Sequence, residues 1–207
     1  MTTAEEKLNG REVQRRETRQ RVYAAAIAEF KRTGMAAADV GVIAKEAGVA
    51  RGTFYFHFPT KEHVLAELER HEEARLAGQL SRFLAAPHDL AGALAEVVRL
   101  MTVMERRVGK VLFWEMLGLH FSPRRPEVLP SADKWAEYPV MTLVVQAVEL
   151  ARERGEVYPG ADALRTAQFF LLGLYAMLIT SHEQPKATRT EILENFLATV
   201  LRGVESR

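Results

Sequence analysis

Apolar side chains recur every three or four residues along most of the chain, which is the spacing typical of α-helices. Val22, Ala26 and Phe30 form one such stripe, and Val97 and Met101 belong to another. The sequence shows neither the alternation typical of β-strands nor an internal repeat. The pattern therefore predicts an all-α fold of about nine helices.

Glycine and proline residues divide this pattern into segments. Gly34 is expected to end the first helix, and Pro87 to limit the fourth. Three prolines within residues 122–131 predict a loop, and a long helix is expected after it, over residues 132–154. Pro139 marks either a kink in that helix or its true start. The last pair of helices is expected at residues 162–181 and 188–202.

The pattern also suggests how the chain is divided into domains. Residues 1–10 lack periodicity, so we expect them to be disordered. Residues 11–60 predict a three-helix domain, and residues 61–207 a larger helical body. The first helix of the body, from residue 61 to about residue 85, is expected to connect the two parts.

Two short helices are predicted in the stretch DVGVIAKEAGVARGTFYFHFPTK, from Asp39 to Lys61. Asp39 is placed to cap the first of them. Gly48 is expected to end it, because glycine adopts the left-handed conformation without a Cβ clash. Only Gly48-Val49-Ala50 separates the two helices, and Pro59 ends the second. Such a short turn forces a steep crossing, which predicts a helix-turn-helix that inspects duplex DNA.

The second of these helices carries groups suited to DNA contact. Its donors, methyl groups and unobstructed backbone can approach base edges and phosphates, while Phe54 and Phe58 are expected to pack inward. The expected DNA-binding residues are Arg51, Gly52, Thr53, Tyr55, His57, Lys61 and Asp39.

The segment AGVARGTFYFHFPTKEHV, preceded by the helix RQRVYAAAIAEFKRTG, resembles the TetR family of bacterial transcriptional regulators. The resemblance covers about the first 65 residues and includes Gly48, Thr53, Tyr55 and Lys61. It implies a homodimer that binds a palindromic operator and is usually a repressor released by a small effector. The resemblance and the side of the helix on which these residues lie suggest two kinds of DNA contact. Thr53, Tyr55 and Lys61 are expected to contact phosphates, while Arg51 and His57 are expected to reach base edges.

Three residues depart from the family pattern, so any operator preference copied from relatives is in doubt. Ala50 stands where a capping Ser or Thr is common. Alanine has no side-chain oxygen to cap the helix, and the loss of such a cap destabilises the helix start by about 1 kcal/mol. Gly41 replaces a larger, often basic residue, and Val42 replaces an acidic one.

The resemblance assigns two tasks to the apolar surfaces of the body. The last two helices resemble the family's dimer pair, a four-helix bundle across a two-fold axis. The expected interface residues are Leu164, Phe170, Leu171, Leu174, Leu178, Ile192, Phe196 and Val200. The second task is an effector pocket lined by aromatic and methionine side chains. Its candidates are Phe113, Trp114, Leu117, His120, Phe121, Trp135, Tyr138, Met141 and Tyr175.

Each pocket candidate, taken singly, is more typical of a packed helical core than of a ligand site. The aromatic bias favours a hydrophobic or aromatic effector, with His120 and then Glu115 as polar handles. An acyl or carboxylate effector stays open, because Arg106, Arg107, Arg124 and Arg125 also occur in this part of the chain. The sequence does not distinguish a repressor from an activator.

Charge and composition narrow the function further. Residues 11–61 contain ten Lys and Arg against five Asp and Glu, a net charge of +5, whereas the rest of the chain carries −4. This asymmetry is typical of a DNA-binding head with a separate regulatory body. The basic run from Arg11 to Arg21 is either a solvated helix face with i, i+4 pairs or an arm that touches phosphates.

No catalytic or cofactor site is evident in the sequence. There is no cysteine, no G-x-S-x-G segment and no glycine-rich phosphate loop, so we expect neither an enzyme nor a bound cofactor. His63, Glu67 and His71 share one helical face, but a solvated polar face is a simpler interpretation than a metal site. We expect a cytoplasmic protein with no membrane contact. The alternative function is a nucleoid or division factor, which binds DNA without an effector.

Overall fold

The computed structural model describes residues 4–123, 125–126 and 138–205, with side chains described from residue 10 onward. Within these residues the chain is helical, apart from one β-bridge between Val157 and Glu205. The helices are α1 Ala4–Thr33, α2 Val40–Glu46, α3 Arg51–His57, α4 Lys61–Leu84, α5 Leu90–Val108, α6 Lys110–His120, α7 Pro139–Glu153, α8 Ala163–Thr180 and α9 Lys186–Val204. The prediction of an all-α protein with about nine helices is confirmed.

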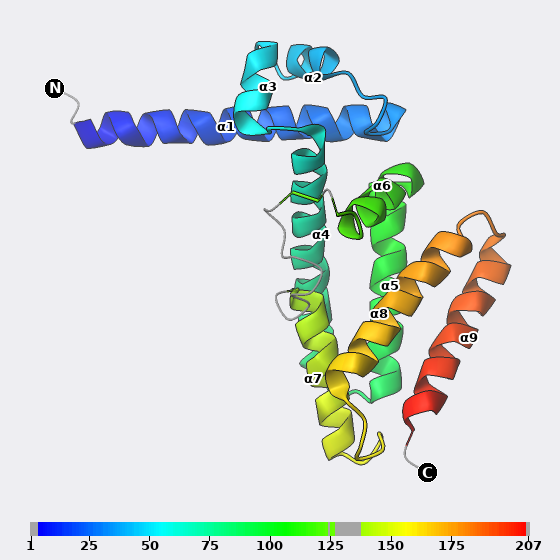
Figure 1. Cartoon of the computed structure of the whole chain (residues 1–207). Helices are drawn as coiled ribbons and strands as arrows, with labels where there is room; N and C mark the ends of the chain where they lie inside the picture. The colour runs from blue at the N-terminus through cyan, green and yellow to red at the C-terminus, as the bar shows by residue number, and fades with distance from the viewer. Residues whose placement is uncertain (1–3, 124, 127–137, 206–207) are drawn as a thin grey trace.

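The helices form a small head and a larger body (Figure 1). In the head, α2 and α3 lie on one side of α1, and α1 runs across the end of α4. Helix α4 then descends into the body, where it contacts α5, α6 and α7. Helices α8 and α9 pack against each other at the far side from α1. A tilt of α4 would therefore move the head relative to the body.

Two sequence predictions about helix starts need comment. Helix α1 begins at Ala4, so the expected disorder of residues 1–10 is wrong from Ala4 onward. Helix α7 begins at Pro139, which decides between the two alternatives for that proline. Proline suits this first-turn position, because its missing N–H would have had no partner inside the helix. The predicted Trp135 and most of the proline-rich loop lie outside the described residues.

Short polar side chains and glycines set the ends of the head helices. The Asp39 carboxylate accepts a hydrogen bond from the Gly41 N–H at 2.6 Å, so Asp39 is the N-cap of α2, as predicted. Gly48 has a φ of 67°, in the left-handed region that the tight turn requires. Thr60 is the N-cap residue of α4, but its side chain makes no capping hydrogen bond. Its hydroxyl lies 3.0 Å from Nδ1 of His63 instead.

Carboxylates of α4 and α6 help to fasten the head to the body. The guanidinium group of Arg19 in α1 donates to the Glu67 carboxylate of α4, with Nη1 at 2.6 Å, and it lies 4.4 Å from the centre of the Phe58 ring. At the other end of α1, the Met35 N–H donates to both oxygens of Glu115 in α6, at 2.9 and 2.8 Å. The head is thus held by one carboxylate from α4 and one from α6.

Gly34 occupies a position that only glycine fits well. Its φ is 79°, and an added Cβ would lie 3.1 Å from Oε1 of Glu115. We expect Gly34→Ala to lower the free energy of unfolding by about 1–3 kcal/mol, because alanine is strained at positive φ and would crowd the Glu115 contact. Urea unfolding followed by circular dichroism measures this change. Gly203→Ala, in α9 with open space around it, is the control, and equal midpoints for both variants would contradict the argument.

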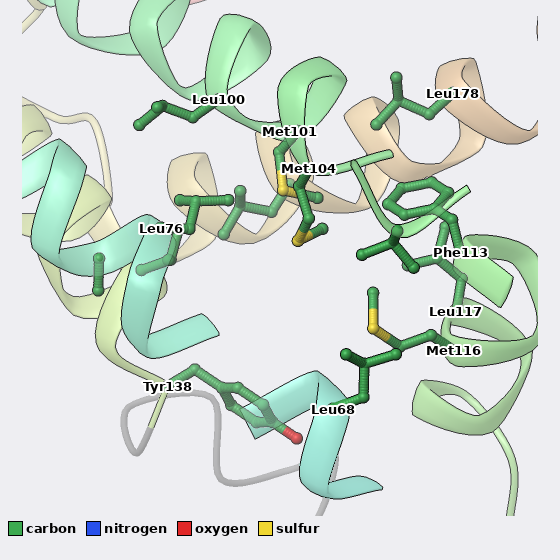
Figure 2. Packing of buried hydrophobic residues seen from close by; sticks show 14 of the residues in the cluster. Leu68, Leu76, Leu100, Met101, Met104, Phe113, Met116, Leu117, Tyr138 and Leu178 are labelled. Carbon is green, nitrogen blue, oxygen red and sulfur yellow. The ribbon is translucent and has the colours of Figure 1, made fainter. Parts of the chain in front are cut away.

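The body core is filled mainly by aliphatic and methionine side chains. Figure 2 shows Leu68 and Leu76 of α4, Met101 and Met104 of α5, and Met116 of α6 around one interior region. All five are buried. Methionine side chains are flexible and polarisable, so these three can change conformation more easily than branched side chains can.

Candidate DNA interface and body cavity

The recognition helix α3 is held in place by two buried aromatic side chains. Phe54 and Phe58 are fully buried, and their ring centres lie 6.1 Å apart. The chain enters α3 at Ala50, which is extended and offers no side-chain cap, as the sequence suggested. Phe54 and Phe58 lie about one helical turn apart and face inward, whereas Tyr55 and Phe56 between them are exposed.

The outward face of α3 carries the residues expected to contact DNA. Arg51, Gly52 and Tyr55 are exposed, and Thr53 and His57 are half-buried. The structure thus brings five of the seven expected residues onto one accessible surface. It adds Phe56, which is 68% exposed and lies 5.5 Å from the guanidinium carbon of Arg15. Sequence analysis missed Phe56, although its phase between two inward phenylalanines indicates an outward position.

The remaining two expected residues have structural roles within the head. Nζ of Lys61 donates to the carbonyl oxygens of Ala36 at 2.8 Å and Ala38 at 3.2 Å, which ties the start of α4 to the loop before α2. Asp39 caps α2, and its negative charge would repel a phosphate. We therefore keep Lys61 as a phosphate candidate at the edge of the surface and assign Asp39 to capping instead.

The basic run in α1 divides into two groups. Arg11, Arg15 and Arg16 are exposed, with Arg16 3.4 Å from Glu12 on the next turn. Arg19 is committed to Glu67, and Nε of Arg21 lies 3.4 Å from the Ala47 carbonyl oxygen. The first group suits a solvated face and equally an arm beside α3, whereas the second group stabilises the head.

The electrostatic setting of α3 is positive. Partial burial lowers the pKa of His57, and the positive charges of Arg19 and Arg15 lower it further. His57 is therefore neutral near pH 7, with one ring nitrogen as a donor and the other as an acceptor. A neutral imidazole can hydrogen-bond a base edge, while the surrounding guanidinium groups attract phosphates.

A small cavity of about 20 Å³ lies inside the body, between α4, α5, α6 and α8, with room for roughly one water molecule. Its lining combines three acidic residues of α4 with methionine, histidine and tyrosine side chains. The lining residues are Glu69, Glu72, Glu73, Met101, Met104, Met116, Leu117, His120 and Tyr175. Larger hollows, such as the groove of about 520 Å³ between α1 and α2, lie open on the surface.

Three of the predicted pocket residues line this cavity: Leu117, His120 and Tyr175. The others are distributed around it. Phe113 and Met141 are packed in the core, Phe121 is 4.8 Å from the His120 ring, and Trp114 packs against His182. Glu115, expected as a polar handle for the effector, instead bonds to Met35. The structure therefore makes the site much more acidic than the predicted aromatic pocket.

Each cavity carboxylate has a different environment. Oε1 of Glu69 lies 2.6 Å from Nδ1 of His120 and 3.6 Å from the Arg125 guanidinium, whereas Oε2 has no hydrogen-bond partner. Glu72 is paired with Arg107, which extends from α5. Glu73 accepts the Val140 N–H at 2.9 Å. Sequence analysis missed this site because it interpreted polar residues of this helix, Glu67 among them, as a solvated face, whereas Glu67 and Glu72 are both buried.

The expected dimer residues divide in the structure. Phe170, Leu171, Leu174 and Leu178 are buried within the single chain, so their assignment to an interface is wrong. Gly173 explains part of this packing, since an added Cβ would lie 2.5 Å from the Phe196 ring. Phe196 therefore packs inside the protomer and stacks on Phe170, with ring centres 6.0 Å apart.

A different apolar stripe of α8 faces outward. Phe169 is 74% exposed and Leu172 39%, and both were missed in the sequence because the whole helix is apolar. Leu164 is exposed as predicted, and Ile192 and Val200 of α9 are half-buried. By length and composition α8 also passes as a membrane span, but its inner face packs on α7 and α9.

The chain thus combines a three-helix head that contains a helix-turn-helix with a larger helical body, an arrangement typical of DNA-binding regulators. Residues 22–68 match the family described as bacterial regulatory proteins, tetR family, a range that covers the head from α1 into α4. The family model thus identifies the head as a TetR-type DNA-binding domain. Regulators with this domain are DNA-binding proteins, which agrees with the expectation that the chain is not an enzyme.

A curated relative is the HTH-type transcriptional regulator AcrR of Shigella flexneri. It is 35% identical over 94 residues, which make up 44% of this chain. The match spans only 42% of the length of AcrR. The activity of the whole protein is therefore not carried over from this relative.

Solved structures share the fold over nearly the whole chain. A Rhodococcus sp. RHA1 protein of unknown function is 21% identical with a TM-score of 0.70, covering 91% of this chain and 95% of its own. FadR of Thermus thermophilus, in complex with lauroyl-CoA, is 24% identical with a TM-score of 0.66, covering 91% and 96%. SmeT in complex with triclosan is 18% identical with a TM-score of 0.61, covering 91% and 92%. At these identities the likeness shows the fold alone.

Proposed function

We propose that this TetR-family regulator is a cytoplasmic homodimeric repressor that binds a palindromic operator and leaves it when a small effector binds the body. The observation that carries the proposal is the outward face of α3, with Arg51, Tyr55 and Thr53 accessible above the buried Phe54 and Phe58. Such a face presents donors to base edges and phosphates on a rigid support.

The exposed stripe of α8 supports a dimer. Phe169 and Leu172 lie one helical turn apart, so they form one continuous apolar strip. A two-fold interface between two such strips buries both copies at once. Two heads related by that axis would read an inverted repeat, since the operator mirrors the protein's symmetry.

The route from effector to DNA follows from the contacts between body and head. Helix α4 carries Glu69 and Glu73 on the cavity and Glu67 on the head, so a change in its tilt acts on both. Helix α6 carries His120 on the cavity and Glu115 on Met35. An effector that binds more tightly to the state with separated heads lowers DNA affinity by that difference, typically about 1–3 kcal/mol.

Two observations bear on whether an effector exists. The cavity is nearly filled, which favours the second candidate, a nucleoid or division factor without an effector. The unpartnered Oε2 of Glu69 and the three methionines, whose unbranched side chains are flexible, favour an effector site that opens on binding. FadR and SmeT, which hold lauroyl-CoA and triclosan, support an effector with a large apolar part.

Fluorescence anisotropy tests the proposed function. The wild-type chain is titrated onto the duplex upstream of its own gene and onto an unrelated duplex of equal length, at two salt concentrations. We expect at least about a thousandfold preference for the first duplex, typical of specific binding. Equal, strongly salt-dependent binding to both duplexes would favour the nucleoid-type factor.

Arg51→Ala is expected to weaken discrimination at one base position by about 1–3 kcal/mol, because arginine reads guanine with two hydrogen bonds in the major groove. Competition with duplexes that vary at single positions measures the change. Arg11→Ala, also exposed and basic but distant on α1, is the control and should weaken all duplexes alike. An unchanged base preference in Arg51→Ala would remove its assigned role.

A further inference from the structure

Three carboxylates line the body cavity, and their described partners are Arg107, Arg125 and the imidazole of His120. Glu72 is paired with Arg107, and Glu69 is shared between His120 and Arg125. Glu73 lines the same space, and the interactions described for its carboxylate include only a backbone N–H. Glu69 and Glu73, on adjacent turns of α4, thus face the same interior space, with the Arg125 guanidinium 3.6 Å from Glu69.

Glu69 supplies the observation that points to a ligand. It is only 7% exposed, and its Oε2 atom is buried without a hydrogen-bond partner, although the other oxygen is bonded to His120. Leaving a buried carboxylate oxygen unpaired is costly, and native structures rarely do so without a functional reason. Since Glu69 lines the cavity, a donor or a positive charge inside the cavity would satisfy this atom.

The other side chains that line the cavity indicate which further chemical groups a ligand would have. Met101, Met104 and Met116 line the same cavity as the three carboxylates, and Figure 2 shows these methionines extending from α5 and α6 toward one another. Among the described residues no group of three or more His, Asp or Glu side chains is arranged so that it could hold a metal ion. A ligand that combines an apolar group with a positively charged group matches both the methionine side chains and the carboxylates of the lining.

We propose that the cavity is a binding site for an organic cation that carries an apolar group, and that the carboxylates of Glu69 and Glu73 hold its charge. This proposal rests on the proposed function only in treating the site as the effector site. The cationic group of the ligand fills the space beside the unpartnered oxygen of Glu69, and the apolar group of the ligand displaces the methionine side chains. Because the cavity holds roughly one water molecule, the site opens when the ligand enters.

The protonation of Glu73 adds a second signature. Burial raises the pKa of Glu73 to about 7; the Glu69 charge also raises it, whereas the Val140 N–H and His120 lower it. The other polar groups around it are Tyr138, Tyr175 and Arg125, the last donating to the Tyr138 hydroxyl. A bound cation favours the ionised form, so binding releases a proton. The affinity should therefore rise about tenfold from pH 6 to pH 8.

Isothermal titration calorimetry with tetraphenylphosphonium tests the proposal, and tetraphenylborate is the probe of matched shape and opposite charge. We expect one cation per chain, and the borate to bind at least tenfold more weakly. Glu69→Gln should weaken cation binding at least tenfold. Glu149→Gln, on the exposed side of α7, is the control and should change it by less than twofold. Glu73→Gln should remove the rise between pH 6 and pH 8.

Three results would overturn the proposal: no cation binding at millimolar concentration, equal or tighter binding of the borate, or full cation affinity in Glu69→Gln. Thermal unfolding of each variant shows whether it is folded, and Glu73→Gln gives an independent readout if Glu69→Gln is not. The DNA titrations above separate this proposal from the proposed function. Specific DNA binding without charge discrimination refutes only the cation site, whereas cation binding without DNA specificity refutes only the regulator.

Discussion

The double variant Phe169→Glu/Leu172→Glu is expected to be monomeric and to bind a palindromic operator at least about 100-fold more weakly than the wild-type chain. Both side chains are exposed on α8, so the substitutions leave the protomer core intact but place like charges across a two-fold interface. Losing the second head removes the avidity of two linked half-site contacts, which is typically about 10²–10⁴-fold.

Analytical ultracentrifugation and anisotropy measure the two effects on the same samples. Leu150→Glu is the matched control, because Leu150 is also exposed and apolar but lies on α7. It should remain dimeric and bind DNA normally. A dimeric double variant, or an equally monomeric control, would mean that the stripe of Phe169 and Leu172 is not the interface.

Arg189→Ala is expected to lower the free energy of unfolding by about 3–5 kcal/mol. Glu105 in α5 is 1% exposed, and the guanidinium group of Arg189 in α9 donates to its Oε2 atom. Removing the cation leaves a buried carboxylate without its charged partner, which costs far more than losing a surface ion pair. The same contact joins α9 to α5, so its loss should also loosen the packing of the helix pair at the proposed interface.

Urea unfolding of the wild-type chain, Arg189→Ala and the double variant Glu105→Gln/Arg189→Ala measures this effect. The double variant should recover part of the loss, because a neutral amide is less costly to bury than an unpaired charge. Arg202→Ala, exposed on the same helix, is the control and should change stability by less than about 0.5 kcal/mol. A loss below 1 kcal/mol in Arg189→Ala would contradict this account of the pair.

The sequence predicted the head well because its signals are local. Gly34 and Gly48 end their helices through their own backbone conformations, and Asp39 caps α2 by accepting from the N–H group two residues further along. The inward Phe54 and Phe58 then leave only one face of α3 for DNA contact. None of these inferences requires knowledge of what packs against the head.

The body was harder to predict because its decisive contacts join distant residues. The burial of Glu72 depends on Arg107, 35 residues away, and Glu115 is used by Met35, 80 residues away. Helix α8 is apolar on both faces, so periodicity alone does not separate the core residue Phe170 from its exposed neighbour Phe169. Only the position of α9, set by the contact of Phe196 with Gly173, resolves the two.

Selection of duplexes from a random library by the wild-type chain tests the central claim most directly. The proposed symmetric dimer predicts enrichment of an inverted repeat, with half-sites centred about 10 base pairs or a multiple of this apart. Phe169→Glu/Leu172→Glu should enrich at most a single half-site. Enrichment of a non-repeated sequence by the wild-type chain, or of no sequence at all, would contradict the account of a two-headed operator-binding regulator.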